Sequence, residues 1–282
     1  MNYILYNPIS GHGNCKELAE KIKNSNVGKS ALIDMTELSY SDFFPSLKDG
    51  DTVTVCGGDG TLNRFVNELP EAELQIKVFY YPSGTGNDFY ADVCEKKSDE
   101  PIEITDYIKG LPTVKVNGKE HKFINGVGYG IDGYCCEIGD KMRAEGKVAN
   151  YTAIAIKGLL FKFKPRNATV IVDGVEKCYK KVWIAPTMFG RHYGGGMIPT
   201  PNQSRDCEPK KLSLMLFHGS GKLKTLMIFP SIFKGEHVKH TECVEVLEGK
   251  NITVKFDRPT PLQIDGETVL GVTEYRAACE KR

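Results

Sequence analysis

Apolar and polar positions alternate between a strand pattern and a helix pattern over the first part of the chain. The apolar runs "YILYN" (3–7), "TVTVC" (52–56) and "IKVFYY" (76–81) are typical of strands. Between them, apolar residues recur at i, i+3, i+4 and i+7, as on one face of a helix. These residues are Cys15, Leu18, Ala19 and Ile22 in one stretch, and Leu62, Phe65, Val66 and Leu69 in the next. Strands alternating with amphipathic helices predict a parallel α/β sheet.

The pattern changes near residue 112. An Asn-Gly pair within 114–125 and an Asp-Gly pair within 168–185 are β-hairpin signals. Further strand-like runs lie at 211–217, 243–249 and 251–256, and helix-compatible stretches lie at 137–161 and 222–234. We therefore expect an N-terminal α/β domain over residues 1–112 and a C-terminal, mostly antiparallel β domain over residues 113–270.

The composition is ordinary for a globular protein. The formal net charge is +1, which gives no global field of the kind that attracts nucleic acid. No apolar stretch is long enough to span a bilayer, and the first residues lack the pattern of a secretory signal. The nine cysteines include no CxxC pair, so they indicate reduced thiols in a cytoplasmic protein and no zinc site.

The stretch "CGGDGT" (56–61) lies where a predicted strand meets a predicted helix. Glycines there let the backbone approach a phosphate, and the start of the helix favours negative charge. Asp59 would repel a bare phosphate, but it fits beside Mg²⁺, which accepts carboxylate oxygens and bridges phosphates. A tight turn in which Asp59 and Thr61 act as helix caps explains this stretch equally well.

Two further loops favour the phosphate interpretation. "YPSGTGNDFY" (81–90) and "NPISGHGN" (7–14) also follow strands, so the parallel sheet would bring all three loops to one edge. They predict a nucleotide-phosphate cradle, with Asp59 and Asp88 near a metal. The chain contains no GxxxxGK[ST] sequence, so the cradle is not a P-loop.

These loops resemble the three N-terminal motifs of the diacylglycerol kinase catalytic family, which includes bacterial diacylglycerol kinases and the sphingosine and ceramide kinases. The matching blocks, in order, are "NPISG" (7–11), "GGDGTLNRFVNEL" (57–69), "PSGTGNDF" (82–89), "FINGVGYGID" (123–132), "GRHYGGGMIPTPNQ" (190–203), "FKGEHVKH" (233–240) and "LQIDGE" (262–267). The resemblance covers nearly the whole chain. It implies a nucleotide-binding α/β domain and a β-sandwich domain with the active site between them. It also implies that the last residues, about 271–282, return to the first domain.

The resemblance also implies roles for individual residues. Asp265 matches the general base, with Glu267 beside it, and Asp59, Asp88 and Asp206 match metal-binding positions. The positions implied for ATP binding are Asn7, Pro8, Ser10, Gly11, Thr36, Gly57, Gly58, Asp59, Gly60, Thr61, Asn63, Ser83, Gly84, Thr85 and Asn87.

The chain departs from the family pattern at two places. Thr113 stands where bacterial members often carry an aspartate of the acidic network. The stretch "RDCEPKKL" (205–212) replaces an Asp-Asp-Gly-like turn that holds a structural Mg²⁺ in the family, and it keeps Asp206 alone of the two aspartates. These departures place the structural metal and one corner of the acidic network in question.

The stretch "KGLLFKFKPR" (157–166) interleaves aromatic and basic residues. Phe161 and Phe163 among lysines and an arginine suit an anionic membrane interface. The alternative, which we favour here, is a helix end whose phenylalanines pack in the core.

We therefore expect an ATP-dependent and Mg²⁺-dependent lipid kinase that phosphorylates diacylglycerol to phosphatidate at a membrane surface, with no nucleic-acid partner. The alternatives are a kinase acting on NAD, which shares the GGDGT motif, and a nucleotide-binding regulatory protein without catalysis. The sequence leaves open the lipid hydroxyl that accepts the phosphate, and whether the protein forms a homodimer.

Overall fold

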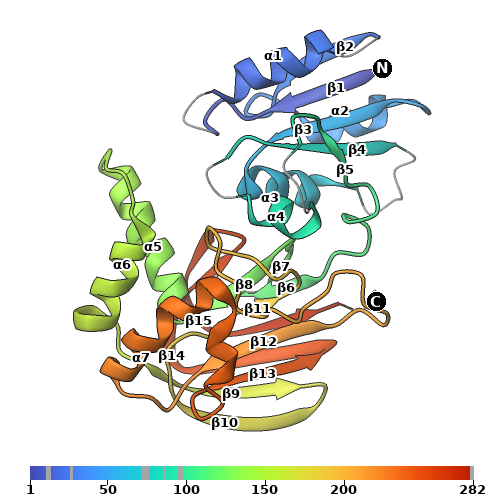
Figure 1. Cartoon of the computed structure of the whole chain (residues 1–282). Helices are drawn as coiled ribbons and strands as arrows, with labels where there is room; N and C mark the ends of the chain where they lie inside the picture. The colour runs from blue at the N-terminus through green and yellow to red at the C-terminus, as the bar shows by residue number, and fades with distance from the viewer. Residues whose placement is uncertain (11–13, 26–27, 71–75, 85–86, 95–97, 280–282) are drawn as a thin grey trace. The chain divides into compact units, whose positions relative to one another are not determined.

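The computed structural model describes residues 1–10, 14–25, 28–70, 76–84, 87–94 and 98–279, with the backbone alone at Thr152. The chain divides into two compact units, Met1–Lys109 and Gly110–Arg282 (Figure 1). Each has its own sheet, and each is described below by itself.

The sheet of the first unit is parallel except at one edge. Its strand order is β2-β1-β3-β4-β5, and only the last strand runs antiparallel to its neighbour. The strands are β1 (Asn2–Tyr6), β2 (Ser30–Asp34), β3 (Thr52–Gly57), β4 (Lys77–Pro82) and β5 (Ile102–Glu103). The parallel α/β architecture predicted from the alternating pattern is confirmed.

Among the described residues, four helices connect these strands, and the predicted apolar faces are the buried ones. Leu62, Phe65 and Val66 are fully buried, as are Cys15 and Ala19. The helices are α1 (Cys15–Ser25), α2 (Tyr40–Ser46), α3 (Asp59–Glu68) and α4 (Asp88–Val93).

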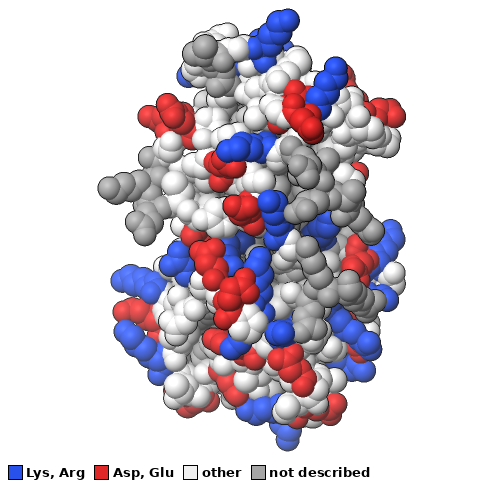
Figure 2. All heavy atoms as spheres, turned by 90° about the vertical axis from the view of Figure 1, so that its right-hand side faces the viewer, with Lys and Arg blue, Asp and Glu red and all other residues white. Residues whose placement is uncertain are grey.

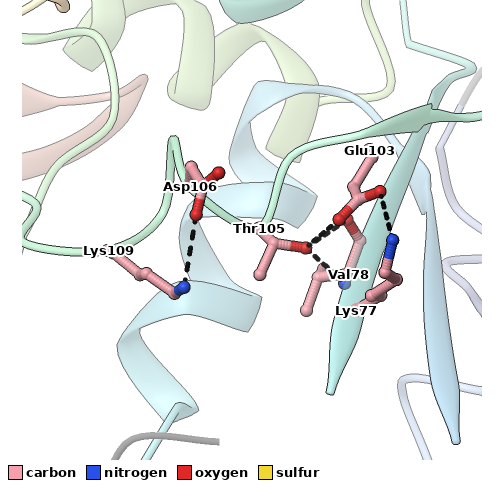
Figure 3. Close-up of polar contacts among 6 residues, drawn as sticks. All are labelled: Lys77, Val78, Glu103, Thr105, Asp106 and Lys109. Atoms are coloured by element: carbon pink, nitrogen blue, oxygen red, sulfur yellow. Dashed lines mark hydrogen bonds and ion pairs between the residues drawn. The ribbon is translucent and has the colours of Figure 1, made fainter. Parts of the chain in front are cut away.

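The last residues of the first unit are held to β4 by a short chain of polar contacts (Figure 3). The Val78 N–H donates to Thr105 Oγ1 at 3.0 Å, and Lys77 Nζ pairs with Glu103 Oε2 at 3.1 Å. Thr105 Oγ1 also donates to Glu103 Oε1 at 3.2 Å. These contacts compensate for the shortness of β5, which has only two residues in the ladder.

The second unit contains a 10-stranded sheet in the described part of the chain. The order β13-β12-β11-β8-β14-β15-β6-β7 forms its main path, and β9 joins it through β14 and pairs with β10. All these pairs are antiparallel, as the hairpin signals predicted. The strands are β6 (Thr113–Val116), β7 (Lys119–Lys122), β8 (Gly126–Tyr129), β9 (Arg166–Val172), β10 (Val175–Val182), β11 (Thr187–Met188), β12 (Leu212–Phe217), β13 (Val244–Gly249), β14 (Asn251–Ile264) and β15 (Glu267–Ala278).

This sheet bends around its own core. One cluster of buried residues takes members from strands as far apart in the order as β6, β9 and β12. At its centre Tyr129 and Phe256 stack, with ring centroids 3.9 Å apart and an interplanar angle of 10°. The antiparallel β fold predicted for this half is confirmed.

The helices of the second unit pack on a separate buried cluster beside the sheet. That cluster includes Ile131, Leu159, Trp183 and Phe217. The helical elements are α5 (Ile131–Ala144), α6 (Tyr151–Lys157), the π-helical turn η2 (Gly158–Lys162), α7 (Lys222–Ile228) and the 3-10 turns η3 (Phe229–Lys234) and η4 (Glu236–Lys239).

The described end of the chain, through residue 279, does not follow the family expectation. Residues 271–278 belong to β15, which pairs with β14 and β6 in the sheet of the second unit. They therefore do not return to the first unit. The physical reason is that β15 is a long strand whose Val272, Tyr275 and Ala277 are buried in the core of this sheet.

The surface shows no strong segregation of charge on the face that Figure 2 presents, where basic and acidic side chains are interspersed. This agrees with the net charge of +1. Among the described residues, none of the helices combines the length and apolar character that crossing a membrane requires.

The two phenylalanines of the basic and aromatic stretch have opposite environments. Phe163 is 4% exposed and packs in the cluster that contains Trp183, with ring centroids 6.3 Å apart. Phe161 is 75% exposed. The core alternative therefore holds for Phe163 and not for Phe161.

Replacing each phenylalanine by alanine should separate the two environments. Phe163→Ala should lower the free energy of unfolding by about 3–5 kcal/mol, because it leaves a cavity in a packed core. Phe161→Ala should change it by no more than about 0.5 kcal/mol. Chemical denaturation of the two variants measures both values, and equal destabilisation would contradict the burial assigned here.

Candidate active site

The loops that follow β1 and β3 are joined through the hydroxyl of Thr61. It accepts a hydrogen bond from Asn7 Nδ2 at 3.2 Å and shares another with Ser10 Oγ at 2.9 Å. The loop after β4 joins them, because the Ser83 N–H donates to Gly57 O at 2.9 Å. The carboxyl ends of parallel strands lie at one edge of a sheet. The structure therefore brings the described parts of the three loops together.

Helix α3 begins inside the GGDGT motif at a point where the backbone is accessible. Its N-cap is Gly58, which has no side chain with which to cap the helix. Gly57 is required by packing, since a Cβ there would lie 2.4 Å from Thr61 Cβ. The first N–H groups of a helix have no partner within the helix, and the helix dipole makes this end positive. This start of α3 is suited to a phosphate group.

Asp59 connects the second loop to the third. Its Oδ2 accepts the N–H of Asp88 at 2.7 Å, and its Oδ1 accepts the N–H of Phe89 at 3.1 Å. These N–H groups begin α4, so the Asp59 carboxylate caps that helix from another element. Asp59 therefore acts as a helix cap, as the alternative interpretation predicted, but it caps α4 and not α3, the helix to which it belongs.

Asn87 has a buried side-chain oxygen with no hydrogen-bond partner in the described part of the chain. Its Nδ2 donates to Gly84 O at 2.7 Å, whereas its Oδ1 is buried and has no hydrogen-bond partner within the described residues. Asp88 follows it and is 6% exposed. Buried acceptors are normally paired, so a donor from a bound ligand or from water on a cation would complete this position.

Tyr80 lies under the same loops. Its hydroxyl donates to Gly57 O at 3.0 Å. Burial raises the pKa of Tyr80 well above its ordinary value, and the nearby Asp59 and Asp88 carboxylates add to that increase. Tyr80 is therefore a permanent donor that fixes the end of β3.

The other predicted nucleotide-contacting residues are arranged around this edge. Thr36 follows β2, where its N–H and Oγ1 donate to Asp34 Oδ1 at 2.8 and 2.7 Å. Asn63 is buried within α3 and accepts Asn67 Nδ2 at 3.2 Å. Pro8 lies in the first loop, and Gly60 lies in the first turn of α3. Gly11 and Thr85 lie outside the described residues.

The metal predictions have less geometric support. Nowhere in the described ranges do three or more His, Cys, Asp or Glu side chains gather in a way that could hold a metal ion. Mg²⁺ commonly takes one or two carboxylates and completes its shell with phosphates and water, so Asp59 and Asp88 fit it as partial ligands. Asp206 is exposed, and its N–H donates to Ser204 Oγ at 3.2 Å.

In the second unit, Asp265 occupies the turn between β14 and β15. Asp265 and Gly266 both have positive φ, 45° and 95°, as a two-residue type I′ turn requires. The carboxylate then accepts three backbone N–H groups: Ile124 to Oδ2 at 2.6 Å, and Asn125 and Gly126 to Oδ1 at 2.8 and 2.9 Å. Asp265 therefore begins the turn and also fixes the segment that leads into β8.

A buried acid lies on the other side of the same turn. Gln263 accepts the Gly266 N–H at 2.7 Å and donates to Asp132 Oδ2 at 2.9 Å. Burial raises the pKa of Asp132 to about 6, and the hydrogen bond from Gln263 offsets part of that increase. Asp132 is inside the "FINGVGYGID" block, but sequence reasoning gave it no role, because a partner 131 residues away is not visible in the chain.

Arg205 is a second residue that the sequence did not identify. It is 7% exposed, and it donates to Ile124 O and, at 2.7 Å, to Asn125 Oδ1. Its guanidinium therefore holds the same segment that Asp265 holds. Glu267, by contrast, is exposed at the start of β15, opposite Ile264 in the ladder.

Asp265→Asn should destabilise the second unit. Asparagine tolerates positive φ, so the turn survives, but its NH₂ group cannot accept the N–H groups that the lost oxygen held. We expect the free energy of unfolding to fall by about 1–3 kcal/mol, as for a partly buried donor left unpaired. Thermal or chemical denaturation measures this change.

Asp173 provides a matched control. It also begins an Asp-Gly turn with positive φ, and its carboxylate accepts the N–H groups of Lys250 and Asn251, but it is exposed. Asp173→Asn should cost less than about 1 kcal/mol. Equal losses in the two variants would contradict the anchoring role given to Asp265.

Asp132→Asn should stabilise the protein at neutral pH. The pKa of Asp132 is higher in the fold than its unfolded value of 3.8, so the fold favours the protonated form. The contribution of this group to stability is complete below that unfolded value and is lost as the pH rises through about 6. We expect the variant to gain up to about 3 kcal/mol at pH 7. The gain should disappear near pH 4, and a pH-independent difference in melting temperature would contradict it.

Comparison with known proteins gives the chain a family. The model of the diacylglycerol kinase catalytic domain matches residues 2–116. The model of the YegS C-terminal NAD kinase beta sandwich-like domain matches residues 125–280. The two matches together take in almost the whole chain.

Similar proteins carry related names. A diacylglycerol kinase of Mycobacterium tuberculosis is 26% identical over 265 residues, which cover 89% of this chain and 84% of that protein. A crystal structure of a diacylglycerol kinase from Bacillus anthracis matches with a TM-score of 0.62 at 16% identity, over 98% of this chain and 93% of that one. The structural match supports the fold, and the domain models support the family. The chain belongs to the diacylglycerol kinase family of lipid kinases, with the catalytic domain followed by the YegS C-terminal domain.

Proposed function

We propose that this chain is an ATP-dependent lipid kinase that transfers the γ-phosphate of ATP to the hydroxyl of diacylglycerol and forms phosphatidate. The observation that carries this proposal is the joining of three strand-end loops at the start of α3, two of them through the hydroxyl of Thr61 and the third through the Ser83 N–H. A rigid arrangement of backbone N–H groups at a helix start suits phosphoryl transfer, because that reaction depends on positioning and on stabilisation of charge.

The phosphates of ATP would lie against the loop backbone at Gly57, Gly58 and Gly60. Gly58 and Gly60 leave space there because they carry no Cβ. Asn7 and Ser10 already hydrogen-bond to Thr61, so these three side chains would be in place before ATP binds. Such preorganisation limits the ordering that binding requires.

Mg²⁺ would be held by Asp88, directly or through water, with Asp59 close to it. The ion, when bound, neutralises charge on the phosphates. The Oδ1 of Asn87, which has no partner among the described residues, suits a water molecule in the shell of such an ion. Asp59 keeps α4 in place through two backbone hydrogen bonds, and so it also positions Asp88.

In the transfer step the lipid hydroxyl oxygen attacks the γ-phosphorus. The new O–P bond forms as the bond from phosphorus to the leaving oxygen of ADP breaks, and the hydroxyl proton passes to a carboxylate. We assign that acceptor to Asp265, whose carboxylate is held in one position by three N–H donors. The acceptor lipid resides in a bilayer, so we expect a cytoplasmic protein that associates peripherally with the membrane.

A lipid panel tests the proposal directly. Purified protein is incubated with Mg-ATP and mixed micelles of diacylglycerol, phosphatidylglycerol, sphingosine or ceramide, and with NAD in a separate reaction. Mass spectrometry identifies the products. We expect phosphatidate from diacylglycerol; a phosphorylated NAD, or no product from any acceptor, would overturn the assignment.

Two pairs of variants locate the chemistry. Asp88→Asn should retain ATP binding and lose turnover by about 100-fold or more, whereas Asp106→Asn, at an exposed ion pair with Lys109, should not. Asp265→Asn should lose turnover to a similar extent at a temperature where it is fully folded, and Asp173→Asn should keep it. Wild-type turnover in Asp88→Asn would reduce Asp88 to a structural residue of α4.

A further inference from the structure

A hollow of about 360 Å³ at the surface of the second unit is rich in positive charge. Its charged lining residues are Lys162, Lys164, Arg166, Arg258 and Glu137. We call this the basic hollow. Four cations against one carboxylate leave it strongly positive, although the chain as a whole has a net charge of only +1. Glu137 is in turn paired with Lys141 at 2.6 Å, outside the lining.

The cations of the basic hollow are crowded and poorly compensated. Burial lowers the pKa of Arg166 and the neighbouring charge of Arg258 lowers it further, while Asp257 and Tyr129 offset part of that decrease. Arg258 pairs with Asp257 at 3.6 Å. Among the residues described, no carboxylate lies within ion-pair distance of Lys162, Lys164 or Arg166. An anion entering the hollow would relieve the repulsion between these like charges.

Large apolar side chains are exposed on η2, which contributes Lys162 to the lining of the hollow, and on α7, which contacts η2. Phe161 precedes Lys162 in η2 and is 75% exposed, while Leu223 and Met227 of α7 are 77% and 76% exposed. We call these three residues the apolar ridge. Leu223 and Met227 are four residues apart and so share one face of α7. Lys222 Nζ donates to Leu160 O at 3.2 Å, which ties α7 to η2.

Figure 1 shows α6 and α7 together at one side of the second unit, away from the turn between β9 and β10. Single exposed apolar residues are common on protein surfaces, but three large ones on contacting elements indicate an interaction surface. Basic residues beside exposed Phe and Leu are the combination found where proteins lie in the interface of an anionic membrane.

We propose that the basic hollow and the apolar ridge dock this protein on a bilayer that contains anionic phospholipid. The hollow receives headgroup phosphate, and the ridge enters the boundary between headgroups and acyl chains. This inference rests on the proposed function and deepens it, because a lipid kinase needs its acceptor at the bilayer surface. Docking needs no ATP, so it can be tested apart from catalysis.

The binding test uses vesicles of phosphatidylcholine with and without phosphatidylglycerol, in the absence of ATP. We expect the full-length protein to sediment with the anionic vesicles and to be released by high salt. The triple variant Lys162→Ala, Lys164→Ala, Arg258→Ala should bind them about 100-fold more weakly, since each cation near an anionic surface contributes roughly fivefold. A charge variant that binds as the wild type does would overturn the proposal.

The apolar ridge is tested separately with a triple variant that combines Phe161→Ser, Leu223→Ser and Met227→Ser. We expect binding to anionic vesicles to weaken at least about tenfold, with little change in melting temperature because all three side chains are exposed. If this variant binds vesicles as strongly as the wild type does, the apolar ridge is not part of the docking surface and the proposal is overturned.

Matched controls remove exposed positive charges or exposed apolar side chains elsewhere in the second unit. Lys115→Ala, Lys119→Ala and Lys180→Ala remove three exposed cations from β6, β7 and β10. Val175→Ser and Leu270→Ser remove two apolar side chains that are 73% and 59% exposed. Both controls should bind vesicles as the wild type does. A loss in the lysine control equal to that in the hollow variant would show that charge alone, without this site, attracts the protein.

Two further outcomes separate this proposal from its rivals. Direct binding of inorganic phosphate, with release from vesicles by phosphate at constant ionic strength, would assign the hollow to a soluble anion and overturn docking. Turnover on a dispersed short-chain diacylglycerol distinguishes docking from catalysis: the hollow and ridge variants should keep it. Vesicle binding without any lipid phosphorylation would reject the proposed function and leave docking supported.

Discussion

The parallel direction of β1, β3 and β4 is the constraint on which the candidate site depends. Parallel pairing places the carboxyl ends of these strands at one edge, and the loops that leave them must therefore share that edge. Thr61 then joins two of the loops by hydrogen bonds, and its packing against Gly57 leaves no room for a side chain there. Phosphate binding at the start of α3 is a consequence that this arrangement allows.

Several carboxylates of this protein hold backbone segments in place. Asp59 caps α4, Asp265 holds the segment before β8, and Asp173 does the same at another turn. Each accepts N–H groups from a segment distant in sequence, which fixes a loop that no regular ladder could hold. Replacing Asp59 or Asp265 would therefore remove backbone hydrogen bonds, and the exposed Asp173 gives a comparison for that loss.

Local charge matters more here than total charge. The net charge of +1 excludes a protein that is drawn to anions over its whole surface, yet the basic hollow concentrates four cations around one cavity. Salt screens charges over about 8–10 Å, so a partner feels the local group and not the sum over the chain. A protein with nearly balanced charge can therefore approach an anionic bilayer with one face and remain unattracted elsewhere.

Periodicity and turn residues determined most of the fold from the sequence. The run "TVTVC", the helix face around Leu62 and Phe65, and the Asp-Gly turns are local signals, and the strands, helices and hairpins follow them. The three loop motifs likewise predicted the edge of the sheet at which the candidate site lies, because the carboxyl ends of parallel strands share one edge.

Tertiary structure alone decided the contacts between residues that are far apart in the sequence. Folding places the Asp59 carboxylate at the start of α4, Asp132 beside Gln263, and Arg205 against the segment before β8. It also pairs residues 271–278 with strands of the second sheet. It also separated Phe161 from Phe163, which look alike in the chain and differ in burial. Each of these outcomes depends on a partner brought close by folding, and neither periodicity nor composition identifies that partner.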